Sequence, residues 1–167
     1  MNAIRSVVLT VLVPAAVAAS VSVNPNIQRV RDYWQQVWSE GNLQAVAEFY
    51  DPACKQGEDF TIEGFQRNVT RQRESFPDFS VEVHEVFAHD NWVATRVTYR
   101  GTHTGRKMFG QEAMNKSIEV PGLDIFIFKE GKCVEHLHVA DHLDLALQIG
   151  VKLAPTPITG NPDASGG

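Results

Sequence analysis

The sequence lacks the short motifs that identify several large classes of enzyme. It contains no Gly-x-Ser-x-Gly nucleophile elbow, no phosphate-binding glycine loop and no dinucleotide-binding fingerprint, which argues against covalent serine catalysis and nucleotide use. It also lacks a basic excess, because its formal net charge is -5, so we expect no nucleic-acid partner. No cofactor and no metal are predicted, since cysteine and histidine do not occur at zinc-ribbon spacing.

Cysteine is scarce, because the 167 residues include only Cys54 and Cys133. In an oxidising compartment these two thiols could form a disulfide. Each could equally remain a free, buried thiol. The sequence leaves both states open.

The one long uncharged run lies at the N-terminus, where Arg5 precedes residues 6–23. The stretch Ala16-Val17-Ala18 is a small-x-small cleavage signature. We therefore expect a signal peptide over residues 1–19 and a secreted or periplasmic mature protein. A retained membrane anchor is the alternative, because the run reaches about the length of a membrane span. After cleavage we expect no association with a membrane.

Apolar residues recur at helical spacing in the first half of the chain. This pattern predicts helices over residues 25–40, 42–50 and 62–76. Asp51-Pro52 is expected to end the second helix, and a loop is expected to follow it.

From residue 79 onward the apolar period changes to two, which predicts β-strands. Strands are expected from residue 79 and over 92–100, 114–120, 123–128 and 133–140, with a break at Pro121-Gly122 and a hairpin turn at 129–132. A last helix is expected over 141–151, and residues 152–167 are expected to form a loose tail.

This order of elements predicts an α+β domain over residues 24–151. The N-terminal helices should pack in the concave face of a curved antiparallel sheet of four or five strands. A concavity between helices and sheet is the usual place for a ligand, so a small hydrophobic molecule is the expected partner.

Four stretches in this order resemble the SnoaL-like polyketide cyclase family, within the nuclear-transport-factor-2-like superfamily. The resemblance covers residues 25–151 and is carried by Trp34 and Trp38 before Glu40-Gly41-Asn42, by Phe76-Pro77-Asp78-Phe79, by Arg100-Gly101-Thr102-His103-Thr104-Gly105, and by Glu130 to His136 running on to Asp141 and Gln148-Ile149-Gly150.

The resemblance implies a cone-shaped barrel that often forms dimers through its outer sheet face. It also implies ring closure by intramolecular aldol condensation, without metal or organic cofactor. In such cyclases an aspartate on the last strand is the base, and a histidine lies on the preceding strand. Counted from Gly131-Lys132, the aspartate position falls on His138 and the histidine position on Asp124, so the two residue types are exchanged here.

The hairpin geometry supports the same pair without the family. If the turn centres on Glu130 and Gly131, Asp124 and His138 lie close to opposite one another, at a cross-strand distance of about 5 Å. A carboxylate at that distance can orient the imidazole and raise its basicity. We therefore expect a catalytic acid/base dyad, and a purely structural ion pair is the alternative.

Four further residues are predicted to contact the substrate, each with a structural alternative. His136 shares a face with His138 and could contact the substrate, or it could be a solvated or dimer-interface histidine. Alternating histidines also occur at metal sites, so a metal is a further alternative. Arg96, inside a strand, needs an acidic partner such as Glu82 or Asp124, or an anionic ligand. His103 could reach the pocket mouth or lie in an exposed loop. Asp141 is a helix cap or a second catalytic group.

Three functions follow from these expectations. The first is a cofactor-free cyclase or isomerase acting on a hydrophobic carbonyl compound. The second is a secreted protein that binds a small molecule without transforming it. The third is an epoxide-type hydrolase, in which Arg96 would hold Asp124. In each case the protein is expected to be a homodimer.

Overall fold

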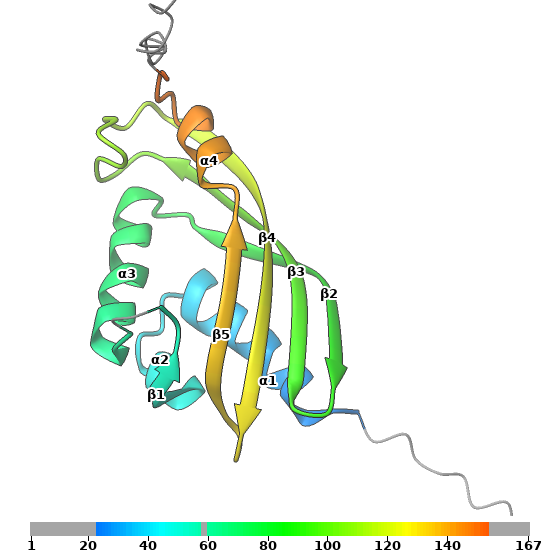
Figure 1. Cartoon of the computed structure of the whole chain (residues 1–167). Helices are drawn as coiled ribbons and strands as arrows, with labels where there is room; N and C mark the ends of the chain where they lie inside the picture. The colour runs from blue at the N-terminus through cyan, green and yellow to red at the C-terminus, as the bar shows by residue number, and fades with distance from the viewer. Residues whose placement is uncertain (1–22, 58–59, 154–167) are drawn as a thin grey trace, which may run out of the picture.

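The computed structural model describes residues 23–57 and 60–153. The predicted signal peptide and nearly all of the predicted tail lie outside these residues. Within the described residues, no helix is both long enough and apolar enough to cross a membrane. In chain order the elements are α1 (Pro25–Tyr33), the π-helix η1 (Trp34–Ser39), α2 (Gln44–Phe49), β1 (Tyr50–Lys55), α3 (Ile62–Ser75), β2 (Ser80–His89), β3 (Trp92–His103), β4 (Lys116–Lys129), β5 (Lys132–Ala140) and α4 (His142–Gln148) (Figure 1).

The α+β prediction is confirmed: the strands form one five-stranded sheet in the order β1-β5-β4-β3-β2, which curves past the helices without closing (Figure 1). β2 to β5 are antiparallel neighbours, as predicted. β1, however, pairs in parallel with β5, so the sheet is mixed.

The expected loop at Asp51-Pro52 was wrong, because residues 50–55 form β1. The error has a physical reason. Proline cannot donate a ladder hydrogen bond, but it is tolerated on edge strands, and β1 is the edge of the sheet.

The expected break at Pro121-Gly122 was also wrong, because β4 runs through both residues. Pro121 lies just beyond the last pair with β5, Gly122 with Ala140, so it needs no donor on that side. At Gly122 a Cβ atom would come within 2.5 Å of the Tyr99 ring. Glycine at this position therefore lets the Tyr99 ring lie flat against β4.

The first helix begins where predicted, with Asn24 accepting a hydrogen bond from the backbone of Asn26. It then widens into the π-helix η1, a geometry that is common at functional sites. In this stretch the Trp38 indole donates to the Tyr33 hydroxyl five residues earlier, at 2.9 Å. Both rings thereby reach the space between helix and sheet.

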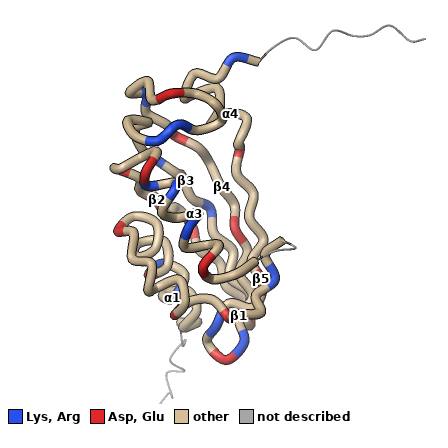
Figure 2. The backbone as a smooth tube through the Cα atoms, turned by 90° about the vertical axis from the view of Figure 1, so that its left-hand side faces the viewer, with Lys and Arg blue, Asp and Glu red and all other residues tan. Residues whose placement is uncertain are grey.

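The two faces of the sheet differ in what covers them. Helices lie over the concave face of the sheet (Figure 1), and strand residues such as Val93, Val97 and Phe126 are fully buried. The outer face instead exposes Leu123, Leu137 and Val139, which are 60%, 48% and 69% accessible. Charged positions of both signs are interspersed along the chain (Figure 2). The outer face of the sheet therefore leaves several large apolar side chains exposed.

Candidate functional site

A cavity of about 460 Å³ lies between the helices and the concave face of the sheet. Its walls are mainly aromatic and aliphatic, which suits an apolar ligand of moderate size. The apolar lining is Tyr33, Trp34, Trp38, Phe65, Phe79, Tyr99, Met108, Phe109, Ile118, Val120, Ala140 and Leu145, and the polar lining is Gln56, Asn68, Gln72, Asp124, His136, His138 and His142.

A β-bulge brings the polar groups of β5 to the cavity. Phe128 pairs with Cys133 whereas Ile127 pairs with Glu135, so Val134 is left as the extra residue. This insertion shifts the register by one residue, and Asp124 then pairs with His138. The predicted cross-strand pairing of these two residues is confirmed.

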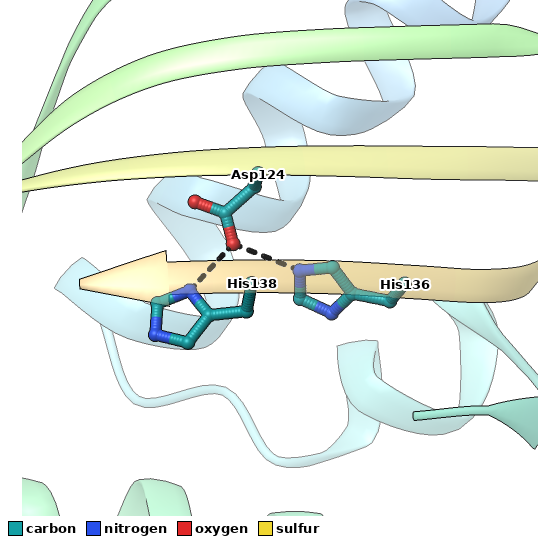
Figure 3. Close-up of side chains that lie close together, drawn as sticks. All are labelled: Asp124, His136 and His138. Atoms are coloured by element: carbon teal, nitrogen blue, oxygen red, sulfur yellow. Dashed lines mark hydrogen bonds and ion pairs between the residues drawn. The ribbon is translucent and has the colours of Figure 1, made fainter. Parts of the chain in front are cut away.

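Three side chains from β4 and β5 meet at one oxygen atom (Figure 3). Asp124 Oδ1 lies 2.9 Å from His136 Nε2 and 2.8 Å from His138 Nδ1. Burial opposes ionisation of Asp124, but the hydrogen bonds from both imidazoles outweigh it and hold the pKa of Asp124 below its usual value. The residue is therefore a carboxylate that can only accept, and both rings donate to it.

The second carboxylate oxygen is also occupied. The Tyr99 hydroxyl donates to Asp124 Oδ2 at 3.3 Å. Burial and the nearby Asp124 charge raise the pKa of Tyr99 well above its usual value, so this hydroxyl stays protonated. Asp124 thus has a donor for each oxygen, which fixes its orientation.

His136 is buried and serves as a neutral support for Asp124. Its Nδ1 lies 2.9 Å from the Gln56 amide nitrogen, a donor, and 2.8 Å from the Tyr50 hydroxyl. Nδ1 therefore accepts, and the ring proton resides on Nε2, facing Asp124. Burial lowers the pKa of His136 despite the nearby carboxylate, so the ring is uncharged near neutral pH.

His138 is different, because it keeps one nitrogen free. Its Nδ1 is committed to Asp124, so in the neutral ring the lone pair resides on Nε2. Among the described residues, Nε2 has no hydrogen-bond partner, and the side chain is 34% exposed at the cavity. This nitrogen is therefore the atom of the site best placed to exchange a proton with a bound molecule.

The same three residues have the composition of a metal site. One ligand atom from each of Asp124, His136 and His138 lies within 4.8 Å of the others, a donor set that suits zinc or iron. In Figure 3, however, both imidazole nitrogens are directed at the carboxylate oxygen rather than at a common point beside it. A cation could bind only if both hydrogen bonds were broken.

The expectation that Arg96 contacts Asp124 or the ligand was wrong, because its side chain is on the outer face of the sheet. There it forms an ion pair with Glu85, with Nη2 2.7 Å from Oε1. The two-residue period of β3 explains the difference: Thr95 and Val97 point inward and are buried, so Arg96 points outward.

His103 and Asp141 likewise lie outside the cavity lining. β3 extends further than expected and ends at His103, whose buried ring has Nε2 2.9 Å from the Arg106 carbonyl. Asp141 is the cap of α4, and it accepts a hydrogen bond from the backbone of Asp144 at 2.8 Å. Asp141 is therefore the helix cap that the sequence left open as its structural alternative. Both expectations for His103, at the pocket mouth or in an exposed loop, were wrong, because its ring is buried at the end of β3.

Sequence reasoning missed several residues of the site. Tyr50 belongs to the strand that was taken for a helix end, so no pattern pointed to it. Tyr99 could have been found, since it lies two and four residues from the inward Val97 and Thr95 on the same strand. His142 lies at the junction of β5 and α4, and only the structure shows that it lines the cavity.

Comparisons with solved structures show the nuclear-transport-factor-2-like fold. TsrD of Streptomyces laurentii has a TM-score of 0.69 at 20% identity, covering 77% of this chain and 98% of its own. IdmH of Streptomyces antibioticus, proposed to be a polyketide cyclase, has a TM-score of 0.67 at 21% identity. The match covers 77% of this chain and 100% of IdmH. AclR of Streptomyces galilaeus, proposed to be a hydroxylase, has a TM-score of 0.64 at 21% identity. The match covers 77% of this chain and 85% of AclR.

Sequence comparison identifies the family. A search among curated proteins finds no match. The sequence profile described as SnoaL-like polyketide cyclase matches residues 28–149, which include every strand and helix from η1 to α4. The chain therefore belongs to the SnoaL-like polyketide cyclase family.

Proposed function

We propose that this protein performs cofactor-free acid/base chemistry, ring closure or isomerisation, on an uncharged, apolar carbonyl compound. His138 is the base, and Asp124 orients it. Compared with the family pattern, the histidine stands where the aspartate base is expected, and the aspartate stands behind it. Although the two residue types have changed places, a basic side chain still lines the cavity.

The observation that carries this proposal is the free Nε2 of His138. Because Nδ1–H donates to Asp124 Oδ1 at 2.8 Å, the opposite nitrogen carries the lone pair, and His138 lines the cavity. Once protonated, the imidazolium is stabilised by the carboxylate behind it. A base positioned in this way contributes roughly 100- to 10,000-fold to a proton transfer.

The lining of the cavity indicates the class of ligand. Within residues 23–57 and 60–153 it includes no lysine and no arginine, and its one fixed charge is the carboxylate of Asp124. An anionic substrate would have no permanent cation to balance it. The rings of Trp38, Phe65 and Tyr99 favour a flat, apolar skeleton, and the amides of Gln56, Asn68 and Gln72 can bind oxygen substituents.

The first chemical step follows from this arrangement. His138 Nε2 removes a proton from the carbon next to a carbonyl group, and the electron pair of that C–H bond moves toward the carbonyl oxygen. The resulting enolate can attack a second carbonyl of the same molecule, which closes a ring, or can be reprotonated elsewhere, which isomerises it. His136 and Tyr99 act only through Asp124 and are positioning residues.

A hydrolase that opens epoxides is less well supported. That mechanism was expected to need a carboxylate held by Arg96, and Arg96 is paired with Glu85 on the other face of the sheet. A protein that binds its ligand without turnover has the same pocket, so the test must separate binding from proton transfer.

The test measures deuterium uptake in D₂O at the carbon next to the carbonyl of flat ketones, with 1-tetralone and anthrone as first probes. Binding is measured in parallel by quenching of tryptophan fluorescence. We expect the wild-type protein to accelerate uptake and His138→Gln to bind the ketone with unchanged affinity but without acceleration. His89→Gln is the matched control, because His89 is fully exposed on the β2–β3 turn. Binding by the wild-type protein without any acceleration would leave the non-catalytic function in its place.

A further inference from the structure

We propose that His142 is a second catalytic residue, which gives a proton to the carbonyl oxygen while His138 takes one from carbon. This inference rests on the proposed function and adds the acid that the base requires. Proton abstraction next to a carbonyl is slow unless charge on the oxygen is neutralised as it develops. The site described above supplies a base but no acid.

His142 is held at the cavity by the start of α4. It is the first residue of that helix, and the cap formed by Asp141 fixes the backbone there. The ring centroids of His138 and His142 lie 6.2 Å apart, and their planes make an angle of 67°. Both rings line the same cavity. A carbonyl group and its neighbouring carbon could therefore contact the two rings at once.

The nitrogens of His142 are free for this role. Within the described part of the chain, its ring makes no hydrogen bond, and the residue is exposed to solvent. His138, by contrast, is tied to a buried carboxylate. One imidazole is thus oriented by a carboxylate, and both nitrogens of the other are free to contact the substrate.

The charged groups near His142 are acidic. Asp141 and Asp144 lie on its own helix, and Asp124 lies behind His138 on β4. The other titratable groups at the cavity are Tyr33 and Tyr99, which burial keeps neutral, and His136, which burial also keeps neutral. The described lining of the cavity includes no lysine and no arginine.

The step balances without an oxidant or a reductant. The C–H bond breaks and its proton goes to His138 Nε2, while its electron pair forms the C=C bond of the enol. The C=O π pair moves to oxygen, and that oxygen takes the proton of the His142 imidazolium. His142 is then neutral and His138 is protonated, and solvent at the cavity mouth returns both rings to their starting states.

The test compares wild type, His138→Gln, His142→Gln and the His89→Gln control in the same deuterium-uptake assay, from pH 5 to pH 9. A base must be unprotonated and an acid protonated, so the wild-type rate should rise and then fall with pH. His142→Gln should lower the rate at pH 7 by roughly 100-fold, leave ketone affinity unchanged, and abolish the fall at high pH. His138→Gln should instead show no acceleration at any pH in this range.

The outcomes separate the two proposals. If His138→Gln is inactive but His142→Gln retains both the wild-type rate and the fall at high pH, the role of His142 is overturned and the proposed function stands. If the wild-type protein itself does not accelerate uptake, the proposed function fails, and the role of His142 fails with it. If His142→Gln loses ketone affinity in proportion to rate, His142 is a binding residue and not the acid.

Discussion

Replacing Asp124 by Asn removes the buried charge and keeps the shape of the side chain. The Asn oxygen can still accept from His136 and His138, and its NH₂ group can meet the Tyr99 hydroxyl, which accepts as readily as it donates. The substitution therefore leaves the hydrogen-bond pattern possible. It removes the negative charge that stabilises the protonated His138.

The expected cost in stability is moderate. A hydrogen bond to a charged group contributes about 1.5–3 kcal/mol and a neutral one about 0.5–1.5 kcal/mol, so each of the three bonds to Asp124 weakens by about 1 kcal/mol. The neutral amide is less costly to bury than a carboxylate, which offsets part of this loss. We expect Asp124→Asn to lower the free energy of unfolding by about 1–2 kcal/mol.

The expected cost in activity is much larger. Without the carboxylate, the imidazolium of His138 loses the counter-charge that stabilises it once the proton has been taken up. We expect kcat for proton abstraction to fall about 1000-fold. The assays are urea denaturation for stability and deuterium uptake for activity, each measured at pH 7.5.

Tyr99→Phe is the matched comparison for this prediction. It removes one donor from Asp124 Oδ2 but leaves the bond between Asp124 and His138 in place. It should reduce stability by about 1 kcal/mol and activity by less than about tenfold. Equal losses of activity in the two variants, or an active Asp124→Asn protein, would refute the reasoning.

Three other predictions concern different parts of the molecule. Because the pKa of His136 is lowered in the folded state, only the unfolded chain takes up a proton at this residue below about pH 6.5. The free energy of unfolding, measured by urea denaturation, should therefore fall between pH 7.5 and pH 5.5, by up to about 1.4 kcal/mol per pH unit for this group. The fall should be smaller in His136→Gln. The exposed outer face should bind a second copy of this chain, so light scattering should report a dimer for the wild type and a monomer for Val139→Glu. Cys54 and Cys133 are free, buried thiols on the paired strands β1 and β5. Oxidation with diamide should join them within one chain, as mass spectrometry after digestion would show, and two unmodified thiols would contradict this.

The sequence predicted those features that depend on local pattern. The hairpin signal at residues 129–132 predicted that Asp124 lies near His138, because a short turn limits the pairing of the strands it joins. The bulge at Val134 then makes the two residues direct partners. The helix start at Asn24-Pro25 and the strands with alternating apolar residues could be predicted for the same reason. In each case the information lies within a few residues of the feature.

Features that depend on distant contacts could not be read in this way. The parallel pairing of β1 with β5 joins residues 50 and 133, and no local signal marks it. The bulge at Val134 decides which face His136 and His138 occupy, yet valine is an ordinary strand residue. The charge state of His136 depends on burial beneath helices that are far away in sequence.

The central claim is that Asp124 holds His138 with its proton on Nδ1 and its lone pair on Nε2. Long-range ¹H–¹⁵N correlation spectra of ¹⁵N-histidine-labelled protein at pH 8 measure this tautomer, and His138→Gln assigns the signals. In the wild type, His138 should be the Nδ1–H tautomer, with its proton on the nitrogen that donates to Asp124. An Nε2–H tautomer in the wild-type protein would contradict the account, because the nitrogen that faces the cavity could then not act as a base.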